Sequence, residues 1–190
     1  MALPVCGVRP LTQEDLEQVR SWRNQERIRN NMYNSEPISA AQQQAWFEGL
    51  QGDASRNYSL FLQDDTPTGC LYYTSIDSGK AQLGYYLGEE RVWPGTGLLL
   101  ELTALDYAFQ KLGLKTLLAE VLAFNSAPQK IHDLFGFERI GTRPTEIVRD
   151  GEPVIAVLFR YERETWCAQR SEILARLPRQ IRAAAALLRY

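Results

Sequence analysis

The chain has 190 residues, of which 45% are apolar and 23% charged, and its formal net charge is −2. These proportions are typical of one soluble globular domain, so they exclude disordered and fibrous proteins, and the small net charge argues against nucleic acid held by bulk charge. The charge is unevenly distributed, however. Residues 165–190 contain five arginines and one glutamate and carry +4, which leaves −6 for residues 1–164.

Other classes are excluded by single residue types. Cys6, Cys70 and Cys167 are far apart and form no CxxC pair, so neither a disulfide framework nor a zinc site is expected. A single histidine, His132, excludes a multi-histidine metal site. The N-terminus lacks the features of a signal peptide, and no apolar run approaches the roughly 18 residues that span a bilayer. We therefore expect a cytoplasmic protein without metal, membrane or nucleic-acid partner.

The first 50 residues predict two helices separated by an irregular stretch. Apolar residues at helical spacing indicate a helix over residues 13–23, with Thr12 as its N-cap. Residues 23–34 are polar and rich in arginine and asparagine, which favours a broken helix or a loop. Ser39 and Gln42 form a capping-box pattern that opens a second helix. The residues expected on its buried face are Trp46, Phe47 and Leu50.

The rest of the chain alternates strand and helix patterns. An antiparallel meander is predicted at residues 58–63, 69–76 and 82–87. A leucine-rich helix over 98–112 ends at Gly113. A strand, a helix and two more strands are then predicted at residues 116–122, 126–135, 137–141 and 154–161. Residues 168–189 predict a last helix, which Pro178 must kink or break. This order indicates a mixed α+β architecture in one domain.

A glycine-containing segment, residues 91–98, lies between the last strand of the meander and the leucine-rich helix. Gly95 and Gly97 lack Cβ atoms, so a ligand can approach the backbone closely. The helix that follows presents unpaired N–H groups and the positive end of its dipole, which suit a pyrophosphate. The segment matches neither the Rossmann fingerprint nor a P-loop. The alternative is a tight strand-to-helix turn without a ligand.

Two further motifs give this segment a context. The strand T-L-L-A-E-V-L-A-F-N ends at Asn125, and the next helix ends in H-D-L-F-G-F, which begins at His132. Together with G-x-G, this pattern resembles the GNAT acetyltransferases, in which Q/R-x-x-G-x-G/A precedes a strand ending in Asn and a helix ending in Y-x-x-x-G-F. Here Val92 takes the Gln/Arg position, Arg91 lies one residue early, and His132 stands where tyrosine is usual. The resemblance covers about residues 8–164.

The resemblance implies a GNAT fold: a central, mostly antiparallel sheet with a splayed parallel strand pair, helices on both faces and an extra C-terminal helix. Residues 1–164 would form the N-acetyltransferase domain, and residues 165–190 a basic helical extension. The apolar side of that extension suggests that it docks on this domain or on a second copy, so a homodimer is possible.

The resemblance also implies that the co-substrate is acetyl-CoA. Backbone amides from Trp93 to Leu98 would hold its pyrophosphate, with Arg91 as a charge partner. The strand 82–87 would pair with the pantetheine arm, and one of Tyr85 and Tyr86 would line the cleft. The residues expected to bind acetyl-CoA are Tyr85, Tyr86, Arg91, Val92, Trp93, Gly95, Thr96, Gly97, Leu98 and Asn125.

Three side chains are candidates for the chemistry, each with a structural alternative. His132 would protonate the departing CoA thiolate, or would be a half-buried helical histidine packed near Phe135. Asn125 would hydrogen-bond pantetheine or the sulfur region, or would cap the helix 126–135. Glu120 lies among apolar residues of a strand, and would either orient a water that takes the amine proton or form an ion pair with an arginine.

The segment W-R-N…N-M-Y…I-S…W-F in the N-terminal half is similar to the nucleotide-sugar N-acetyltransferases of the pseudaminic acid pathway. This implies acetylation of the 4-amino group of UDP-4-amino-4,6-dideoxy-N-acetyl-β-L-altrosamine, a flagellin glycosylation precursor. The residues expected to bind the sugar nucleotide are Arg23, Arg27, Arg29, Met32, Tyr33, Trp46 and Thr74. The alternative for these residues is a solvated loop in which Arg23 pairs with an acid. The alternatives for the function are a protein N-terminus or other amine as acceptor, and a non-catalytic acetyl-CoA-binding module.

Overall fold

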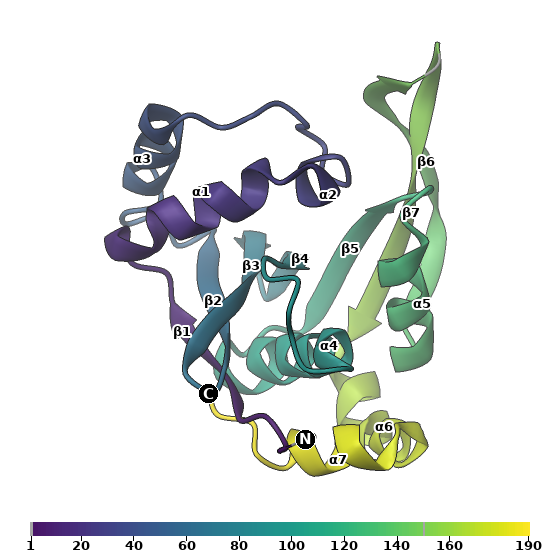
Figure 1. The fold of residues 1–190 in the computed structure, drawn as a ribbon. Helices are drawn as coiled ribbons and strands as arrows, with labels where there is room; N and C mark the ends of the chain where they lie inside the picture. The colour runs from purple at the N-terminus through teal and green to yellow at the C-terminus, as the bar shows by residue number, and fades with distance from the viewer. Residues whose placement is uncertain (1, 150) are drawn as a thin grey trace.

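A computed structural model describes residues 2–149 and 151–190 as one mixed sheet flanked by helices (Figure 1). The sheet has seven strands in the order β1-β2-β3-β4-β5-β7-β6. Its strands are β1 (Cys6–Pro10), β2 (Asn57–Gln63), β3 (Thr66–Asp77), β4 (Lys80–Leu87), β5 (Thr116–Leu122), β6 (Glu138–Arg149) and β7 (Glu152–Glu162). The helices are α1 (Leu16–Asn24), α2 (Glu26–Arg29), α3 (Ala40–Glu48), α4 (Thr96–Asp106), α5 (Ser126–Phe135), α6 (Arg163–Arg176) and α7 (Arg179–Ala185).

One strand pair of the sheet is parallel, β4 with β5, and the other neighbours run antiparallel. The parallel register runs from Lys80 opposite Thr116 to Leu83 opposite Ala119. It stops there, although both strands continue for several residues. The two strands therefore separate along their C-terminal halves, and the predicted mixed sheet with a splayed parallel pair is confirmed.

The meander β2-β3-β4 is closed by residues with the backbone that tight hairpins need. Asp64 and Asp65 have φ of 50° and 61°, and Ser78 and Gly79 have φ of 49° and 83°. Two consecutive positive φ angles match the right-handed twist of the flanking strands, which is why Asp-Asp and Ser-Gly stand at these turns.

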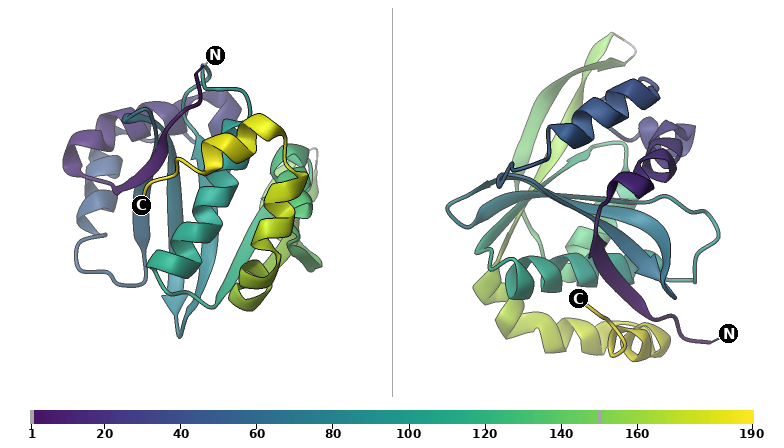
Figure 2. Two further views of the ribbon diagram at one scale, coloured as in Figure 1. Left: turned by 90° about the horizontal axis from the view of Figure 1, so that it is seen from below. Right: turned by 90° about the vertical axis from the view of Figure 1, so that its left-hand side faces the viewer.

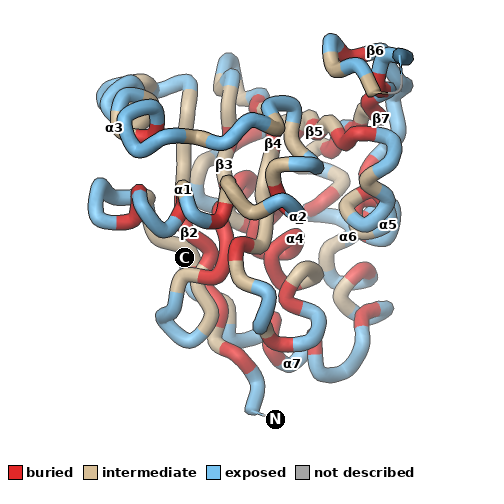
Figure 3. The backbone as a smooth tube through the Cα atoms, turned by 45° about the horizontal axis from the view of Figure 1, so that its top comes forward, coloured by how far each residue is buried: buried red, intermediate tan, exposed pale blue. Residues whose placement is uncertain are grey.

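Helices cover both faces of the sheet (Figure 2). The helices α1, α2 and α3 lie on one face, and α4 lies on the other beside α5, with α7 packed against it. Nearly every residue of α4 is buried (Figure 3), because its leucine-rich sequence fits between the sheet and the C-terminal helices. The main core therefore centres on α4, while a smaller cluster of Val19, Trp22, Ile28 and Leu60 holds α1 and α2 to the sheet.

Several predicted bounds need correction. No strand was predicted before residue 13, yet β1 pairs with β2 at the edge of the sheet. The strand after residue 137 extends to Arg149 because it forms a long hairpin with β7. The leucine-rich helix ends its regular part at Asp106 and continues as a π-helical turn, Tyr107–Lys111. The predicted buried face of α3 is only half-buried; its buried residue is Gln43.

The C-terminal helices dock on this chain through one buried carboxylate. Asp106, at the end of α4, accepts hydrogen bonds from Trp166 Nε1 at 2.9 Å, from Arg170 at 2.8 and 2.7 Å, and from the Tyr190 hydroxyl at 2.9 Å. The predicted C-terminal helix begins at Arg163, as α6, instead of at residue 168. The predicted break at Pro178 is confirmed, since α7 starts at Arg179. A domain boundary at residue 164 stays a prediction, although α6 and α7 contribute side chains to the main core.

Within residues 2–149 and 151–190, none of the helices has both the length and the apolar character needed to cross a membrane. The same residues contain no group of three or more histidine, cysteine, aspartate or glutamate side chains placed to hold a metal ion.

Candidate active site

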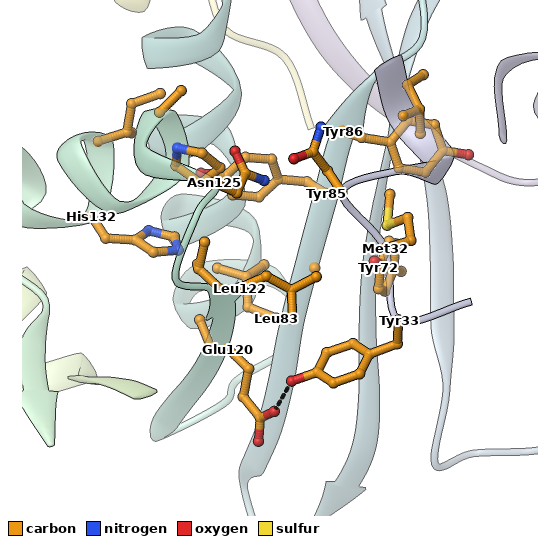
Figure 4. A pocket seen from close by; sticks show the side chains of 18 of the residues that line it. Met32, Tyr33, Tyr72, Leu83, Tyr85, Tyr86, Glu120, Leu122, Asn125 and His132 are labelled. Atoms are coloured by element: carbon orange, nitrogen blue, oxygen red, sulfur yellow. Dashed lines mark hydrogen bonds between the residues drawn. The ribbon is translucent and has the colours of Figure 1, made fainter. Parts of the chain in front are cut away.

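A cavity of about 780 Å³ lies where β4 and β5 separate (Figure 4). Among the described residues, the main-chain groups of Gly84–Leu87 on the side of β5 have no strand partner, because the parallel register has ended at Leu83. The predicted site residues that line the cavity are Arg27, Met32, Tyr33, Tyr85, Tyr86, Gly97, Glu120, Asn125 and His132. Both tyrosines of β4 line it, although only one of them was expected to.

The glycine loop offers fewer donors than the sequence suggested. The N–H of Trp93 donates to Gln63 Oε1 at 3.0 Å, that of Thr96 to Trp93 O at 3.0 Å, and that of Leu98 to Gly95 O at 2.9 Å. The N–H groups of Gly95 and Gly97 have no acceptor in the described part of the chain. Gly95 has φ of 97°, which favours glycine, and Gly97 faces the cavity at the start of α4. These two amides fit a pyrophosphate.

Arg91 and Val92 lie outside the main cavity. With Trp93, they line a smaller hollow beside Gln63 and Asp64. Arg91 is exposed and forms no ion pair within the described residues. It can meet the pyrophosphate only if its side chain reaches over the loop, so its role as a charge partner stays a prediction.

His132 is buried, with 3% of its surface exposed, and its ring is oriented by a carboxylate. His132 Nδ1 lies 3.0 Å from Glu101 Oε1. The hydroxyl of Tyr85 donates to the other oxygen of Glu101. Burial, followed by the charge of Glu101, raises the pKa of Tyr85 well above its usual value, so this hydroxyl remains a donor. His132 is buried more deeply than the half-buried histidine of the structural alternative, and it also lines the cavity.

Asn125 occupies the N-cap position of α5, but its side chain makes no capping hydrogen bond. It lines the cavity near Tyr85 (Figure 4). An amide side chain without a capping partner is available to a ligand, which favours the ligand-binding alternative over the cap.

Glu120 forms the ion pair that the sequence left open. Arg143 on β6 donates to its Oε2 at 2.6 Å, and the Tyr33 hydroxyl donates to the same oxygen at 2.5 Å. Burial raises the pKa of Glu120, but the hydrogen bonds from Arg143 and Tyr33 outweigh it and the pKa is lowered overall. Burial and the bond to Glu120 raise the pKa of Tyr33 to about 12. A carboxylate with a lowered pKa is a weak base, so this arrangement favours binding over proton removal.

Of the other six predicted acceptor residues, Arg27 and Met32 line the cavity and four do not. Arg27 lines it while donating to Leu87 O at 3.1 Å and to Gly88 O. Arg29 instead donates to Ser35 O at 2.9 Å and pairs with Glu26. The predicted residues away from the cavity are Arg23, Arg29, Trp46 and Thr74.

Three of the residues away from the cavity have different surroundings in the fold. Arg23 forms no ion pair with an acid in the described chain, and its Nη1 is buried without a partner. Trp46 packs edge-on against Tyr58, with ring centroids 4.9 Å apart, so its ring is occupied within the fold. Thr74 precedes a register shift in β3, which turns the strand so that Ser75 lines the cavity in its place.

The sequence alone did not predict three residues of the site, namely Glu101, Tyr72 and Arg143. Glu101 stands alone among leucines, and this isolated acid was a signal that could have found it. Tyr72 lines the cavity because Gly84 makes room for it: a Cβ at Gly84 would lie 2.1 Å from the Tyr72 ring. Arg143 could be placed only by the pairing of β6 and β7, since it lies 23 residues from Glu120.

A single parallel strand pair separates here beside a glycine loop at a helix N-terminus, which is the arrangement that the resemblance to the acetyltransferases implied. The family model for the acetyltransferase (GNAT) domain matches residues 7–138. The chain belongs to the GNAT acetyltransferase family, and it is an N-acetyltransferase whose co-substrate is acetyl-CoA.

Individual relatives agree with this family. Acetyltransferase PseH of Campylobacter jejuni is 26% identical over 122 residues, which is 64% of this chain and 76% of the relative. The spermidine N-acetyltransferase of Vibrio cholerae, solved with CoA and spermine, has a TM-score of 0.79 at 17% identity and covers 86% of this chain and 98% of its own. An N-acetyltransferase of Staphylococcus aureus Mu50 has a TM-score of 0.69 at 21% identity, covering 83% and 98%. The two structures support the fold alone.

Proposed function

We propose that this enzyme transfers the acetyl group of acetyl-CoA to the 4-amino group of a UDP-linked 4-amino-4,6-dideoxy sugar, as in the biosynthesis of pseudaminic acid for flagellin glycosylation. The similarity to Acetyltransferase PseH and the W-R-N…N-M-Y segment support this acceptor. The reaction would take place in the cytoplasm, where acetyl-CoA and nucleotide sugars are present.

The observation that carries the proposal is the charge of the cavity lining. Its charged side chains are two arginines, Arg27 and Arg143, and one glutamate, Glu120. A UDP-sugar brings a diphosphate and one amine, so two cations and one carboxylate complement it. Each charge-assisted hydrogen bond to the diphosphate contributes about 1.5–3 kcal/mol.

The remaining acceptor-side residues fit the same ligand. Tyr33 is 45% exposed beside Met32, so its ring is accessible for stacking on uracil. Glu120 is held ionised by Arg143 and would attract the amine that is to be acetylated. The neutral amine would then attack the thioester carbonyl, and its proton would leave to solvent.

A polyamine acceptor is the competing proposal, because spermidine N-acetyltransferases share this fold. Spermidine carries several positive charges and no negative ones. Glu120 could attract one amine of either ligand, but the two arginines of the lining have an anionic partner only in the diphosphate of a UDP-sugar.

An acceptor panel with a thiol reagent tests these proposals. We expect kcat/KM for the UDP-amino sugar to exceed that for spermidine by at least about 100-fold, which corresponds to about 3 kcal/mol. The same sugar without UDP should be turned over poorly, since the diphosphate contacts are lost. Faster turnover of spermidine or of a peptide N-terminus would refute the sugar acceptor. Binding of acetyl-CoA with no thiol release on any amine would indicate a non-catalytic module.

A further inference from the structure

Glu101 is a fully buried carboxylate, with 0% of its surface exposed, on a helix that is otherwise apolar along this turn. Removing such a group from water is costly unless hydrogen bonds replace the lost hydration. Its two oxygens contact different elements of the fold. One accepts a hydrogen bond from the Tyr85 hydroxyl on β4, and the other lies 3.0 Å from His132 Nδ1 on α5. If this position only had to pack, another leucine would stabilise the helix more than a buried carboxylate does.

We propose that Glu101 is a positioning residue for acetyl transfer, which holds His132 with its proton on Nδ1 and directs Nε2 to the cavity. A carboxylate only accepts hydrogen bonds, so the ring nitrogen that faces it must carry the hydrogen. The Tyr85 hydroxyl occupies the other oxygen, which fixes the carboxylate in turn. Nε2 has no protein partner within the described residues and belongs to a ring that lines the cavity.

The helix α4 links this pair to the acetyl-CoA loop. Gly97 and Glu101 are four residues apart and therefore lie on one face of α4, one turn from each other. The helix α5 packs along that face: Ile131 Cδ1 would lie 3.6 Å from a Cβ at Gly97, and the next residue, His132, meets Glu101. The element that would bind pyrophosphate thus also aims the imidazole, so both are fixed relative to the same ligand.

The surroundings of the ring leave Glu101 as its polar partner. The rings of Phe137 and Phe159 pack against His132 with centroids 4.4 and 5.0 Å away, and Tyr85 lies edge-on at 6.1 Å. The neighbouring acid, Asp133, is occupied by Arg139 at 2.6 and 2.8 Å. Within the described residues, the orientation of the imidazole therefore depends on the contact with Glu101.

This arrangement serves the transfer of the acetyl group from the sulfur of CoA to the amine nitrogen. The amine nitrogen bonds to the thioester carbonyl carbon and releases one proton to solvent, while the bond from that carbon to sulfur breaks. The Nε2 atom of His132, whose ring keeps its proton on Nδ1, takes a second proton from solvent and gives it to the departing sulfur. Glu101 keeps its electrons and its two hydrogen bonds throughout. It acts only by orienting the ring and by balancing the charge on it.

His132 is the one histidine of the chain, so ¹⁵N NMR of histidine-labelled protein reports on it without assignment. We expect the neutral ring of the wild-type protein to carry its proton on Nδ1. A neutral ring protonated on Nε2 overturns the proposal. This measurement needs neither a variant nor an acceptor, so it decides the proposal even if Glu101 variants fail to fold.

Kinetics of Glu101→Gln provide the second readout. An amide can donate as well as accept, so the tautomer preference of His132 should be lost. We expect kcat to fall by at least about tenfold, while KM for acetyl-CoA stays within about twofold. His132→Ala should lower kcat by about 100-fold, and adding Glu101→Gln to it should change kcat by less than about twofold. Additive losses would mean that Glu101 does not act through His132.

Asp106→Asn is the matched control, because Asp106 is an equally buried carboxylate five residues further along α4 and bonds the C-terminal helices instead of the cavity. It should lower the melting temperature but leave kcat and the His132 spectrum unchanged. An equal loss of kcat in Asp106→Asn would assign the effect to helix stability and overturn the proposal. The inference rests on acetyl transfer and not on the sugar acceptor, so the kinetics use whichever amine the panel shows to be turned over.

Discussion

Ile181→Ala tests whether the C-terminal helix α7 supports the acetyl-CoA loop. Ile181 is 3% exposed and belongs to the main core. Its Cδ1 would lie 2.2 Å from a Cβ built at Gly95, so it is the side chain nearest to that glycine. Removing it opens space directly beneath a loop whose Gly95 and Gly97 amides are expected to bind pyrophosphate.

The magnitudes follow from two separate effects. Truncating a buried isoleucine to alanine costs about 2–5 kcal/mol of unfolding free energy, depending on how far the site collapses. If the loop shifts enough to weaken one amide-to-phosphate hydrogen bond, the loss of about 0.5–1.5 kcal/mol raises KM for acetyl-CoA by about two- to twelvefold.

Ile173→Ala is the matched control, since Ile173 is 4% exposed in the same core but lies on α6. Urea denaturation should show similar losses of stability for the two variants, whereas steady-state kinetics should show a raised KM for acetyl-CoA only in Ile181→Ala. Equal KM values in the two variants would refute the reasoning, because α7 would then contribute stability and nothing to the loop.

Three further predictions concern other parts of the molecule. The hydrogen bond from Arg9 holds the pKa of Asp15 at about 2, below its usual 3.8, so the ionised carboxylate stabilises the fold above about pH 4 and this stabilisation is lost as the pH falls towards 2. In urea denaturation, Asp15→Asn should lower the free energy of unfolding by about 2 kcal/mol at pH 7. The unfolding free energy of the variant should also depend less on pH between about pH 4 and 2. Gly84→Ala places a Cβ 2.1 Å from the Tyr72 ring, and kcat/KM for the acceptor should fall about tenfold or more; unchanged kinetics would place Tyr72 outside the acceptor site. Arg143→Ala should raise KM for the UDP-amino sugar about tenfold and leave KM for acetyl-CoA unchanged, and the opposite pattern would assign Arg143 to the acetyl-CoA half.

The elements that sequence predicted best are those with local signals at both ends. The strand 116–122 and the helix 126–135 have the predicted bounds, because Asn125 stands at the N-cap position and Gly136 ends the helix with a positive φ. The strand β1 had no such signal. Its five residues include a glycine and a proline, and they become a strand only through pairing with β2 and contact with Arg189.

The candidate site divides in the same way. Gly97, Asn125 and His132 lie in short motifs that carry the family resemblance, and all three line one cavity. Glu101, Tyr72 and Arg143 enter the site through contacts between segments distant in the chain, and no periodicity encodes those contacts. Arg29 and Trp46 were expected at the acceptor site but do not line the cavity, because their side chains contact residues nearby in the chain, Ser35 and Tyr58.

The early end of the β4–β5 register has a consequence for how such an enzyme can diversify. The half of the cavity beside Gly84–Leu87 presents main-chain groups, which every amino acid carries, whereas the half at Tyr33, Glu120 and Arg143 presents side chains. Substitutions can therefore rewrite the second half while leaving the first intact. A TM-score of 0.79 at only 17% identity shows that this fold tolerates extensive substitution of its side chains, as such a division requires.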